Sequence, residues 1–265
     1  MSKIPIKTSE QLEIMAEGGK KLALILNEVL QKATSGVSTL QINNWIEDSI
    51  VQAGGIASFK QVPRYHWASC VGINNEVVHS IPKKDKIIKN GDILKIDAGM
   101  LWKGFNTDAS WTIIVPSTDY CLQTTEEKLE NRFLRAGEEA LRKAIEAAKA
   151  GNRVGHISQA IQKVIEEAGY FPVKILTGHG IGRGLHEEPL IPCFLQNKIE
   201  NTALLIPGMS LAIEVIYTLR ETDLVMEKDN WTISTKDGKI AGLFEETVAV
   251  TENGPLILTA IEEKD

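Results

Sequence analysis

Apolar residues recur at steps of three and four in two long segments, one near the start of the chain and one just past its middle. The recurring positions are Leu12, Met15, Gly19, Leu22, Leu26 and Val29 in the first, and Phe133, Ala136, Ala140, Leu141, Ala144, Ile145 and Ala148 in the second. This spacing places one apolar stripe along a helix. Thr8 with Gln11, and Thr124 with Glu127, have the spacing of a capping box. We therefore predict two long amphipathic helices.

A shorter helix is predicted after each long one, roughly over residues 39–53 and 156–168. Gly54 and Gly169 follow directly, where glycine suits the left-handed cap that ends a helix. Short apolar or alternating runs, broken by Gly, Asn and Pro, then predict strands. These runs cover residues 70–74, 93–98, 106–115, 210–219 and 243–251. The chain thus reads twice as helix, helix, strands, which predicts an α+β fold with four helices backing a sheet.

The two series of elements also resemble each other in sequence. Four positions match at a constant offset of 115, namely Ile42, Ile50, Ala53 and Gly54 with Ile157, Ile165, Ala168 and Gly169. Residues 91–97 resemble residues 208–214 at an offset of 117. Such an internal repeat indicates two related structural units. We predict one domain over residues 1–265, with halves at about 1–120 and 121–265 that join at residues 117–125.

Composition narrows the class of protein. Of the 265 residues, 43% are hydrophobic and 24% charged, which is typical of a globular protein and excludes disorder over most of the chain. The longest apolar run near the start, residues 22–26, is far shorter than the ~20 residues of a membrane span. A net charge of −6 argues against a DNA-binding surface, so we expect neither a DNA nor a membrane partner. Three cysteines without a CxxC pair, and a start without a signal peptide, predict a cytoplasmic protein.

Two aspartates, Asp97 and Asp108, lie near the ends of two predicted strands. A hairpin that turned at residues 101–104, midway between them, would place them directly opposite each other, with Cβ atoms ~4.5–5.5 Å apart. Two carboxylates this close repel each other, and burying them without a partner is costly. One divalent cation, or two, removes the conflict, although two surface aspartates would give the same sequence pattern.

The repeat adds two further acids. Asp97 corresponds to Glu214, which stands between apolar neighbours, and Asp108 corresponds to Glu245 after an insertion in the second half. Each half then contributes two carboxylates from a strand pair. Four carboxylates that converge between two related halves would bind a pair of metal ions. Glu246 competes with Glu245 for the last position, and we favour Glu245 because the repeat pairs it with Asp108.

A glycine-rich run over residues 178–184 contains His179 and ends shortly before His186. It lacks the GxGxxG register and the Gly-Lys-Ser/Thr ending of nucleotide-binding loops. We expect its glycines to let the backbone approach a metal or a peptide closely. His79 is a third histidine among apolar residues, and each of the three, taken alone, is also compatible with a structural role. His66, in an aromatic loop, would either line a pocket or stand exposed.

Together these motifs resemble the methionine aminopeptidases of the type without an N-terminal extension, from Thr8 to about Thr259. The matching motifs are residues 75–82, 96–97, 106–108, 178–189, 207–209 ahead of Glu214, and 244–247. The resemblance implies the pita-bread fold, in which two pseudo-symmetric helix-helix-hairpin halves form a curved, mainly antiparallel sheet backed by helices. It also implies metal-dependent hydrolysis of the first peptide bond, which removes the initiator methionine from peptides and nascent proteins.

The family's site residues carry over by position. The implied ligands of two divalent metal ions, which would be Mn, Fe, Co or Zn, are Asp97, Asp108, His179, Glu214 and Glu245. Asp108 and Glu245 would bridge both ions. His79 and His186 would contact the substrate and donate hydrogen bonds during catalysis, while Glu214 would shuttle a proton. The candidates for the wall of the methionine pocket are Tyr65, Cys70 and Trp231.

The chain also departs from the family pattern. Ser80 stands where the family has Gly, Val215 where it has Pro, and Glu246 where it has His. Residues 62–67 lack the usual glycine- and aromatic-rich pattern beside the side-chain pocket. These departures leave two alternatives, an aminopeptidase of the same fold with another first-residue preference and a non-catalytic peptide-binding paralogue. The expected partners are peptide and nascent-protein N-termini, bound by a monomer near the ribosome.

Overall fold

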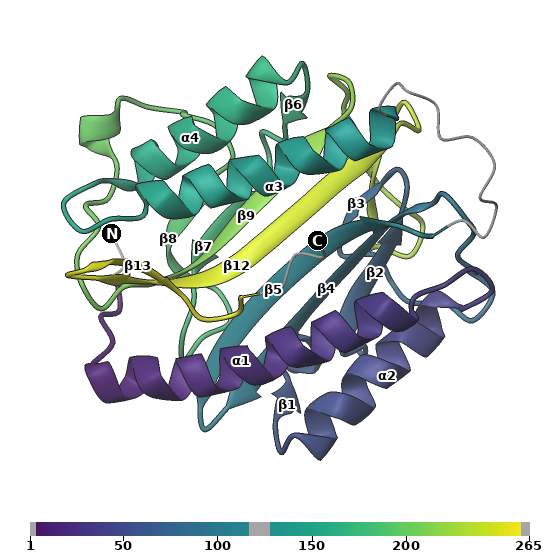
Figure 1. The fold of residues 1–265 in the computed structure, drawn as a ribbon, viewed down its shortest axis with the longest axis horizontal. Helices are drawn as coiled ribbons and strands as arrows, with labels where there is room; N and C mark the ends of the chain where they lie inside the picture. Colours follow the sequence, from purple (N-terminus) through teal and green to yellow (C-terminus); the bar gives the residue numbers. More distant parts are fainter. Residues whose placement is uncertain (1–3, 117–127, 261–265) are drawn as a thin grey trace.

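The structure, a computed structural model, describes residues 4–116 and 128–260. Over these residues four α helices lie on one side of a large sheet (Figure 1). They are α1 (Ser9–Lys32), α2 (Thr39–Gln52), α3 (Leu129–Ala147) and α4 (Val154–Glu167). The predicted α+β arrangement is therefore confirmed. In the part of the chain that is described, none of the helices has the length and apolar character needed to cross a membrane.

The large sheet has ten strands, and its main path runs β1-β4-β5-β12-β9-β7-β8. The strands of this path are β1 (Ile56–Ala57), β4 (Ile93–Trp102), β5 (Phe105–Ile114), β12 (Ala241–Thr251), β9 (Ser210–Thr218), β7 (Thr177–Gly180) and β8 (Glu187–Pro192). Three more strands pair with β4, β9 and β12 respectively, namely β2 (Ser69–Ile73), β6 (Phe171–Pro172) and β13 (Gly254–Ile257). The pairings within this sheet are antiparallel.

A second, small sheet brings distant segments together. Its order is β10-β11-β3, with bounds β10 (Leu224–Met226), β11 (Ile233–Thr235) and β3 (Glu76–Val78). Two 3-10 helices, η1 (Ser58–Gln61) and η2 (Ile199–Asn201), complete the described elements. Strands β10 and β11 belong to the connection between β9 and β12, so this connection packs against β3 of the first half.

Local sequence signals account for the helix ends. Thr8 forms the predicted capping box, in which its hydroxyl accepts from the backbone N–H of Gln11 and the Gln11 side chain accepts from the Thr8 N–H. Gly54 and Gly169 have φ of 81° and 82°, as predicted for left-handed caps after α2 and α4. The predicted box at Thr124 and Glu127, like the predicted joint at residues 117–125, lies outside the described residues. The third helix begins at Leu129.

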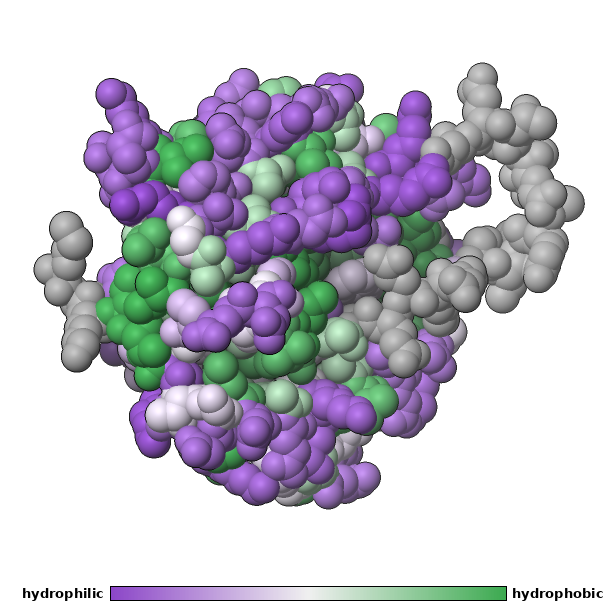
Figure 2. Space-filling model, turned by 60° about the vertical axis from the view of Figure 1, so that its left-hand side comes forward, coloured by the Kyte–Doolittle hydropathy of each residue, from purple (hydrophilic) through white to green (hydrophobic). Residues whose placement is uncertain are grey.

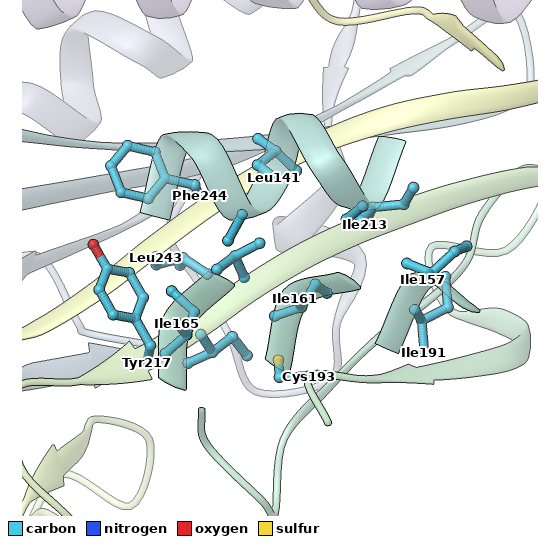
Figure 3. Packing of buried hydrophobic residues seen from close by; sticks show 14 of the residues in the cluster. Leu141, Ile157, Ile161, Ile165, Ile191, Cys193, Ile213, Tyr217, Leu243 and Phe244 are labelled. Carbon is cyan, nitrogen blue, oxygen red and sulfur yellow. The ribbon is translucent and has the colours of Figure 1, made fainter. Parts of the chain in front are cut away.

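The helices attach to the sheet through apolar side chains. Figure 3 shows part of the larger cluster, in which α3 and α4 pack against strands of the second half; its labelled residues are Leu141, Ile157, Ile161, Ile165, Ile191, Cys193, Ile213, Tyr217, Leu243 and Phe244. Burial of one such side chain contributes about 1.5–3 kcal/mol. The hydroxyl of Tyr217 also donates to the carbonyl of Phe133 at 2.6 Å. Polar residues cover much of the face in Figure 2, with apolar residues gathered in a band between two polar regions.

The two halves repeat the same elements at the predicted offsets. Helices α2 and α4 have 14 residues each and both ends lie 115 positions apart, and the four repeat isoleucines are fully buried. Strands β4 and β9 begin 117 positions apart. The division into one domain with halves at about 1–120 and 121–265 stays a prediction, which the continuous sheet supports.

Candidate active site

A cavity of about 150 Å³ lies on the sheet where the two halves meet. Its lining residues are Phe59, Val62, Tyr65, Cys70, Val78, His79, Asp97, Asp108, His179, Leu185, His186, Glu214, Trp231 and Glu245. All ten residues that sequence predicted for the site are among them. The cavity thus combines four carboxylates, three histidines and an apolar wall, and its described lining includes neither lysine nor arginine.

Strand alternation brings the four carboxylates to one face. Asp97 follows Ile96 on β4, and Ile96 packs into the core beneath α1 and α2. Glu245 follows Phe244 on β12, and Phe244 packs beneath α3 in the same way. Because successive side chains of a strand point to opposite faces, the acids point away from the helices and into the cavity.

The predicted pairing of the first two acids is wrong by one step. The hairpin turns at Lys103 and Gly104, with φ of 48° and 84°, so Asp108 pairs with Gly99 and Asp97 pairs with Ser110. Two positive φ values are typical of a type I′ turn, which fixes a two-residue loop. The turn lies one residue beyond the midpoint of the two aspartates. They are therefore diagonal neighbours on the same face rather than directly opposite.

The second half differs in register. Glu214 on β9 lies directly opposite Glu245 on β12. The two halves meet where β5 lies beside β12, a boundary that we call the seam. Across this seam, Glu245 pairs with Ser110 of β5. Beside this pair, the hydroxyl of Thr247 accepts from the Asp108 N–H at 2.8 Å and donates to the Asp108 carbonyl at 2.7 Å. The seam thus holds acids of both halves at fixed positions.

Glu246, the rival of Glu245, lies on the other face of β12. It is buried, and its carboxylate accepts a hydrogen bond from the Thr259 hydroxyl. Strand alternation separates the two neighbouring glutamates, so only Glu245 reaches the cavity.

His179 is placed on β7 by its flanking glycines. A Cβ at Gly178 would lie 2.5 Å from the Ala212 carbonyl oxygen, and one at Gly180 would lie 2.1 Å from that of Glu188. The approach that these glycines allow in the structure is to neighbouring backbone, and their approach to a metal or a peptide stays a prediction. Their role is to let β7 fit tightly between β8 and β9.

The His179 ring is neutral and turns one nitrogen toward the acids. Burial, together with the neighbouring His186, lowers the pKa of His179 to about 4. Its Nδ1 lies 2.9 Å from the Gly180 carbonyl, which assigns the ring proton to Nδ1 as donor. Nε2 then carries a lone pair and lies 3.6 Å from Glu214 Oε1. When Glu214 is ionised, two acceptors face each other here, so the contact is not an ion pair and a cation between them would satisfy both.

The carboxylates likewise have oxygen atoms that lack a partner. Asp97 Oδ1, Asp108 Oδ1 and Glu245 Oε1 are buried without a hydrogen-bond partner among the described residues. Burial is the largest cause that raises the pKa of all four acids, and neighbouring carboxylates raise those of Asp108, Glu214 and Glu245 further. Ligand atoms of Asp108, His179 and Glu245 lie within 4.8 Å of one another. Hard oxygens with one imidazole nitrogen are a donor set that fits a divalent cation.

Two further histidines face the cavity. The rings of His179 and His186 are 4.4 Å apart at 73°. His79 has φ of 54°, which is uncommon for a residue with a side chain, and the next residue, Ser80, pairs through its carbonyl with the Val71 N–H. Burial lowers the pKa of His79 and of His186, with a further contribution from His186 to His79. Both rings remain accessible from the cavity and are neutral at pH 7.

The apolar wall is built from rings in edge-to-face contact. Tyr65 lies 5.1 Å from Trp231 and 6.4 Å from Phe59, between ring centroids. Its hydroxyl donates to the Ser69 carbonyl at 2.9 Å and lies 3.1 Å from Cys70 Sγ. Cys70 is a buried free thiol, and so is Cys193, whereas Cys121 lies outside the described residues.

Four members of this wall were not predicted from the sequence, namely Phe59, Val62, Val78 and Leu185. Three of them lie outside the sheet strands, where no periodicity marks an apolar residue as pocket-facing. The available signal is a lone large apolar residue in a polar loop, as with Phe59 between Ser58 and Lys60. His66 is exposed and does not line the cavity.

Comparisons with known proteins agree with this geometry. A model of metallopeptidase family M24 matches residues 13–252. Methionine aminopeptidase 1 of Bacillus subtilis is 37% identical over 255 residues, covering 96% of this chain and 98% of the relative. A methionine aminopeptidase structure from Thermotoga maritima has a TM-score of 0.90 at 35% identity, covering 97% and 99%. A prolidase from Pyrococcus furiosus shares the fold, with a TM-score of 0.75 at 23% identity, covering 97% and 66%.

Proposed function

The chain belongs to metallopeptidase family M24, and from this premise we propose that it is a metal-dependent aminopeptidase specific for methionine. It hydrolyses the first peptide bond of peptides and nascent proteins and thereby releases the initiator methionine. Relatives from several bacteria that match nearly the whole chain carry this activity in their names. The pita-bread fold, shared with the Thermotoga structure, holds the site between its two halves.

Five side chains would hold the metal, namely Asp97, Asp108, His179, Glu214 and Glu245. The single observation that carries this assignment is the buried set of carboxylate oxygens without partners, which faces the lone pair of His179 Nε2. We infer two divalent ions, since four carboxylates exceed what one cation neutralises, and the donors suit Mn, Fe, Co or Zn. Bound metal would polarise the scissile carbonyl and lower the pKa of water toward ~7.

Glu214 is the proton carrier in this proposal. Its side chain keeps 14% exposure against 6% for His179, so it is reachable from the cavity while it remains beside the other acids. Its carboxylate takes a proton from the attacking water and passes it to the leaving amine. The neutral rings of His79 and His186 each have one N–H to donate, and they bind the carbonyl oxygen of the substrate as negative charge develops there.

The apolar wall receives the side chain of the first residue. Tyr65, Cys70, Trp231 and Phe59 all line the cavity, and they belong to one hydrophobic cluster. A methionine thioether makes favourable contacts at the edges of aromatic rings and adapts to an irregular pocket. This combination favours methionine over branched or charged first residues.

Hydrolysis of Met-Ala-Ser and of Leu-Ala-Ser, measured with each of the four metals, tests the proposal. We expect cleavage of the methionine peptide only with metal, and a loss of at least about 100-fold in kcat for Glu214→Gln. Glu246→Gln is the matched control, because this acid lies on the other face of the same sheet, and it should keep its activity. Preference for the leucine peptide would assign another first-residue specificity, and the absence of both metal binding and cleavage would assign a non-catalytic peptide-binding protein.

Three further properties stay predictions. The cytoplasmic location, the monomeric state and the action on nascent chains near the ribosome follow from the family and not from any contact in the molecule. Sedimentation of the purified protein measures the second, and co-sedimentation with ribosomes measures the third.

A further inference from the structure

The loop over residues 181–186 joins the two histidines of the site. It leaves β7 after Gly180, next to His179, and enters β8 at Glu187, directly after His186. The loop has no regular backbone ladder of its own, so the position of the His186 ring depends on the contacts that hold the loop. Ile181, at the start of the loop, is held by Ser210, and two further contacts come from segments far away in the sequence.

The first contact is an ion pair. Lys7 Nζ donates to Glu187 Oε2 at 2.6 Å, across 180 positions of sequence, and the two side chains are only 4% and 10% exposed. The other oxygen, Glu187 Oε1, accepts from the Gly184 N–H at 2.9 Å within the loop. One carboxylate therefore ties the loop to itself and to the segment that precedes α1.

Lys7 is itself held at both ends. Its backbone N–H donates to the Gly208 carbonyl at 2.8 Å. Its side chain runs so close to Gly182 that a Cβ there would lie 2.4 Å from Lys7 Cε. Such packing leaves the ammonium little freedom, and a buried charge pair with fixed partners defines a position better than an exposed one.

The second contact comes from the first half of the sheet. Asn106 Nδ2 donates to the carbonyls of Gly182 and Arg183, at 3.0 Å each, and the Asn106 N–H donates to Gly182 at 2.7 Å. Asn106 Oδ1 accepts from the Ser58 hydroxyl at 2.8 Å, next to Phe59 of the cavity wall. The start of the loop is therefore fixed to the sheet through Asn106. At its end Glu187 pairs with Gly180 in the β7–β8 ladder, and its carboxylate, held by Lys7, ties the loop back to Gly184, two residues before His186.

We propose that Lys7 is a positioning residue for His186: its ion pair with Glu187 fixes the end of the 181–186 loop and so aims the His186 ring at the substrate. This proposal rests on the proposed function, because it assigns Lys7 to the same reaction. Loss of the pair leaves the loop attached at Asn106 and at the Gly180–Glu187 ladder pair, but it releases the carboxylate that holds Gly184 close to His186. A displacement on the order of 1 Å at a substrate-binding group lowers the rate by up to about 100-fold.

A double-mutant cycle on the metal-loaded enzyme tests the proposal. Lys7→Met should lower kcat/KM for Met-Ala-Ser by roughly 10- to 100-fold. In a His186→Ala background the same substitution should change kcat/KM by less than about 3-fold, while its effect on Tm is equal in both backgrounds. Equal kinetic effects in the two backgrounds, or wild-type kcat/KM for Lys7→Met, would overturn the proposal.

Further variants separate positioning from stability. Thr202→Val is the matched control, because Thr202 holds Gly155 and Ile199 through its hydroxyl far from the cavity. It should lower Tm without changing kcat/KM. Gly182→Ala and Glu187→Gln perturb the same pair while Lys7 itself is kept, and they should reproduce the kinetic effect of Lys7→Met, also if that variant fails to fold. Wild-type kinetics in both of these variants would contradict the proposal.

A spectroscopic measurement makes failure of this proposal distinguishable from failure of the proposed function. The chain has five histidines, so the imidazole proton signals can be resolved and assigned by single His→Gln variants. Lys7→Met should shift the His186 signal and leave that of His156 in place, whether or not the protein cleaves peptides. An unmoved His186 signal would refute the positioning role even in an active enzyme.

Discussion

The two halves supply equivalent acids to the site, but they connect their strands in different ways. In the first half, β4 and β5 are joined by the two-residue turn at Lys103 and Gly104, and the aspartates are diagonal neighbours. In the second half, β9 and β12 are joined by a long connection, and the glutamates lie directly opposite each other. That connection forms β10 and β11 and supplies Trp231 to the cavity wall.

This difference separates two functions of the site, metal binding and selection of the substrate side chain. The carboxylates sit on the repeated strands, where the ladder fixes them, and a repeat can therefore evolve a symmetric charge site. The wall that receives the substrate side chain comes mostly from other segments: the long connection, η1 and the loop that carries Tyr65, with Cys70 added by β2. Metal binding should thus depend on acids of both halves, with His179 added by the second, whereas selectivity should depend on the unrepeated parts.

The largest effect is expected when one acid is removed from either half, which tests whether the two halves contribute alike. Asp108→Asn and Glu245→Gln should each lower kcat by more than about 100-fold, which is the upper loss seen for outer-shell metal partners. Both variants should also bind less metal, as measured by elemental analysis after dialysis. A large loss in one variant with near-normal activity in the other would end the equivalence of the halves.

The next largest effect concerns the stability of the protein after a chelator has removed its metal. Burial raises the pKa of Asp97 to about 7, and burial raises those of Asp108, Glu214 and Glu245 as well. Unfolded carboxyls ionise near pH 4, so between about pH 4 and 7 the folded state binds more protons than the unfolded chain. The free energy of unfolding should therefore fall as pH rises through this window.

Urea unfolding at pH 5 and pH 7, with a chelator and then with Mn²⁺, measures this effect. Added cation should restore the stability lost at pH 7, because it neutralises the ionised acids. Asp97→Asn and Glu214→Gln should flatten the pH dependence to a similar degree if the halves contribute alike. A free energy of unfolding that rises with pH in the metal-free wild-type protein would contradict the prediction.

A smaller effect is expected for the wall. Trp231→Ala should lower kcat/KM for Met-Ala-Ser by roughly 10-fold, since it opens the pocket and removes ring contacts of the thioether. The ratio of methionine to leucine cleavage should fall as well, while metal content stays unchanged. Trp67→Ala is the matched control, because this ring lies 5.3 Å from Tyr65 but does not line the cavity. Equal effects in both variants would show a general packing defect.

The smallest effect concerns the turn that carries Trp231. Asp229 accepts from the N–H groups of Trp231 and Thr232 and from Lys83 Nζ. Although burial raises it, hydrogen bonds from Lys83, Thr232 and Trp231 lower the pKa of Asp229 to about 2. The carboxylate thus stabilises the fold above about pH 4 and loses this contribution as pH falls toward 2. Asp229→Asn should cost under about 1 kcal/mol at pH 7, measured by urea unfolding, and less near pH 2, where part of the carboxyl is protonated in the folded state.

The sequence predicted the repeated part well because periodicity and alternation report it directly. The apolar stripe of α1, the offset of α2 and α4, and the faces of Asp97 and Glu214 all follow from side-chain spacing. Alternation also separates Glu245 from Glu246 once the strand is known. The register of the first hairpin was out of reach, because it depends on whether Lys103 adopts a positive φ.

The unrepeated part was predicted less completely for a physical reason. Phe59 and Leu185 reach the cavity from irregular segments, whose course is set by distant contacts such as Asn106 with Gly182. The pair of Lys7 and Glu187 joins residues 180 positions apart, and no local pattern marks either residue. Resemblance to a family identifies ligands at fixed positions, but it does not reveal what holds a loop in place.

The seam between β5 and β12 sets how this molecule can move. Thr247 exchanges two hydrogen bonds with the backbone of Asp108 directly beside the acid cluster, where Ser110 pairs with Glu245. A hinge rotation of one half against the other would break these hydrogen bonds and move the acids of the two halves apart. The acid cluster therefore requires that the two halves stay fixed against each other across β5 and β12.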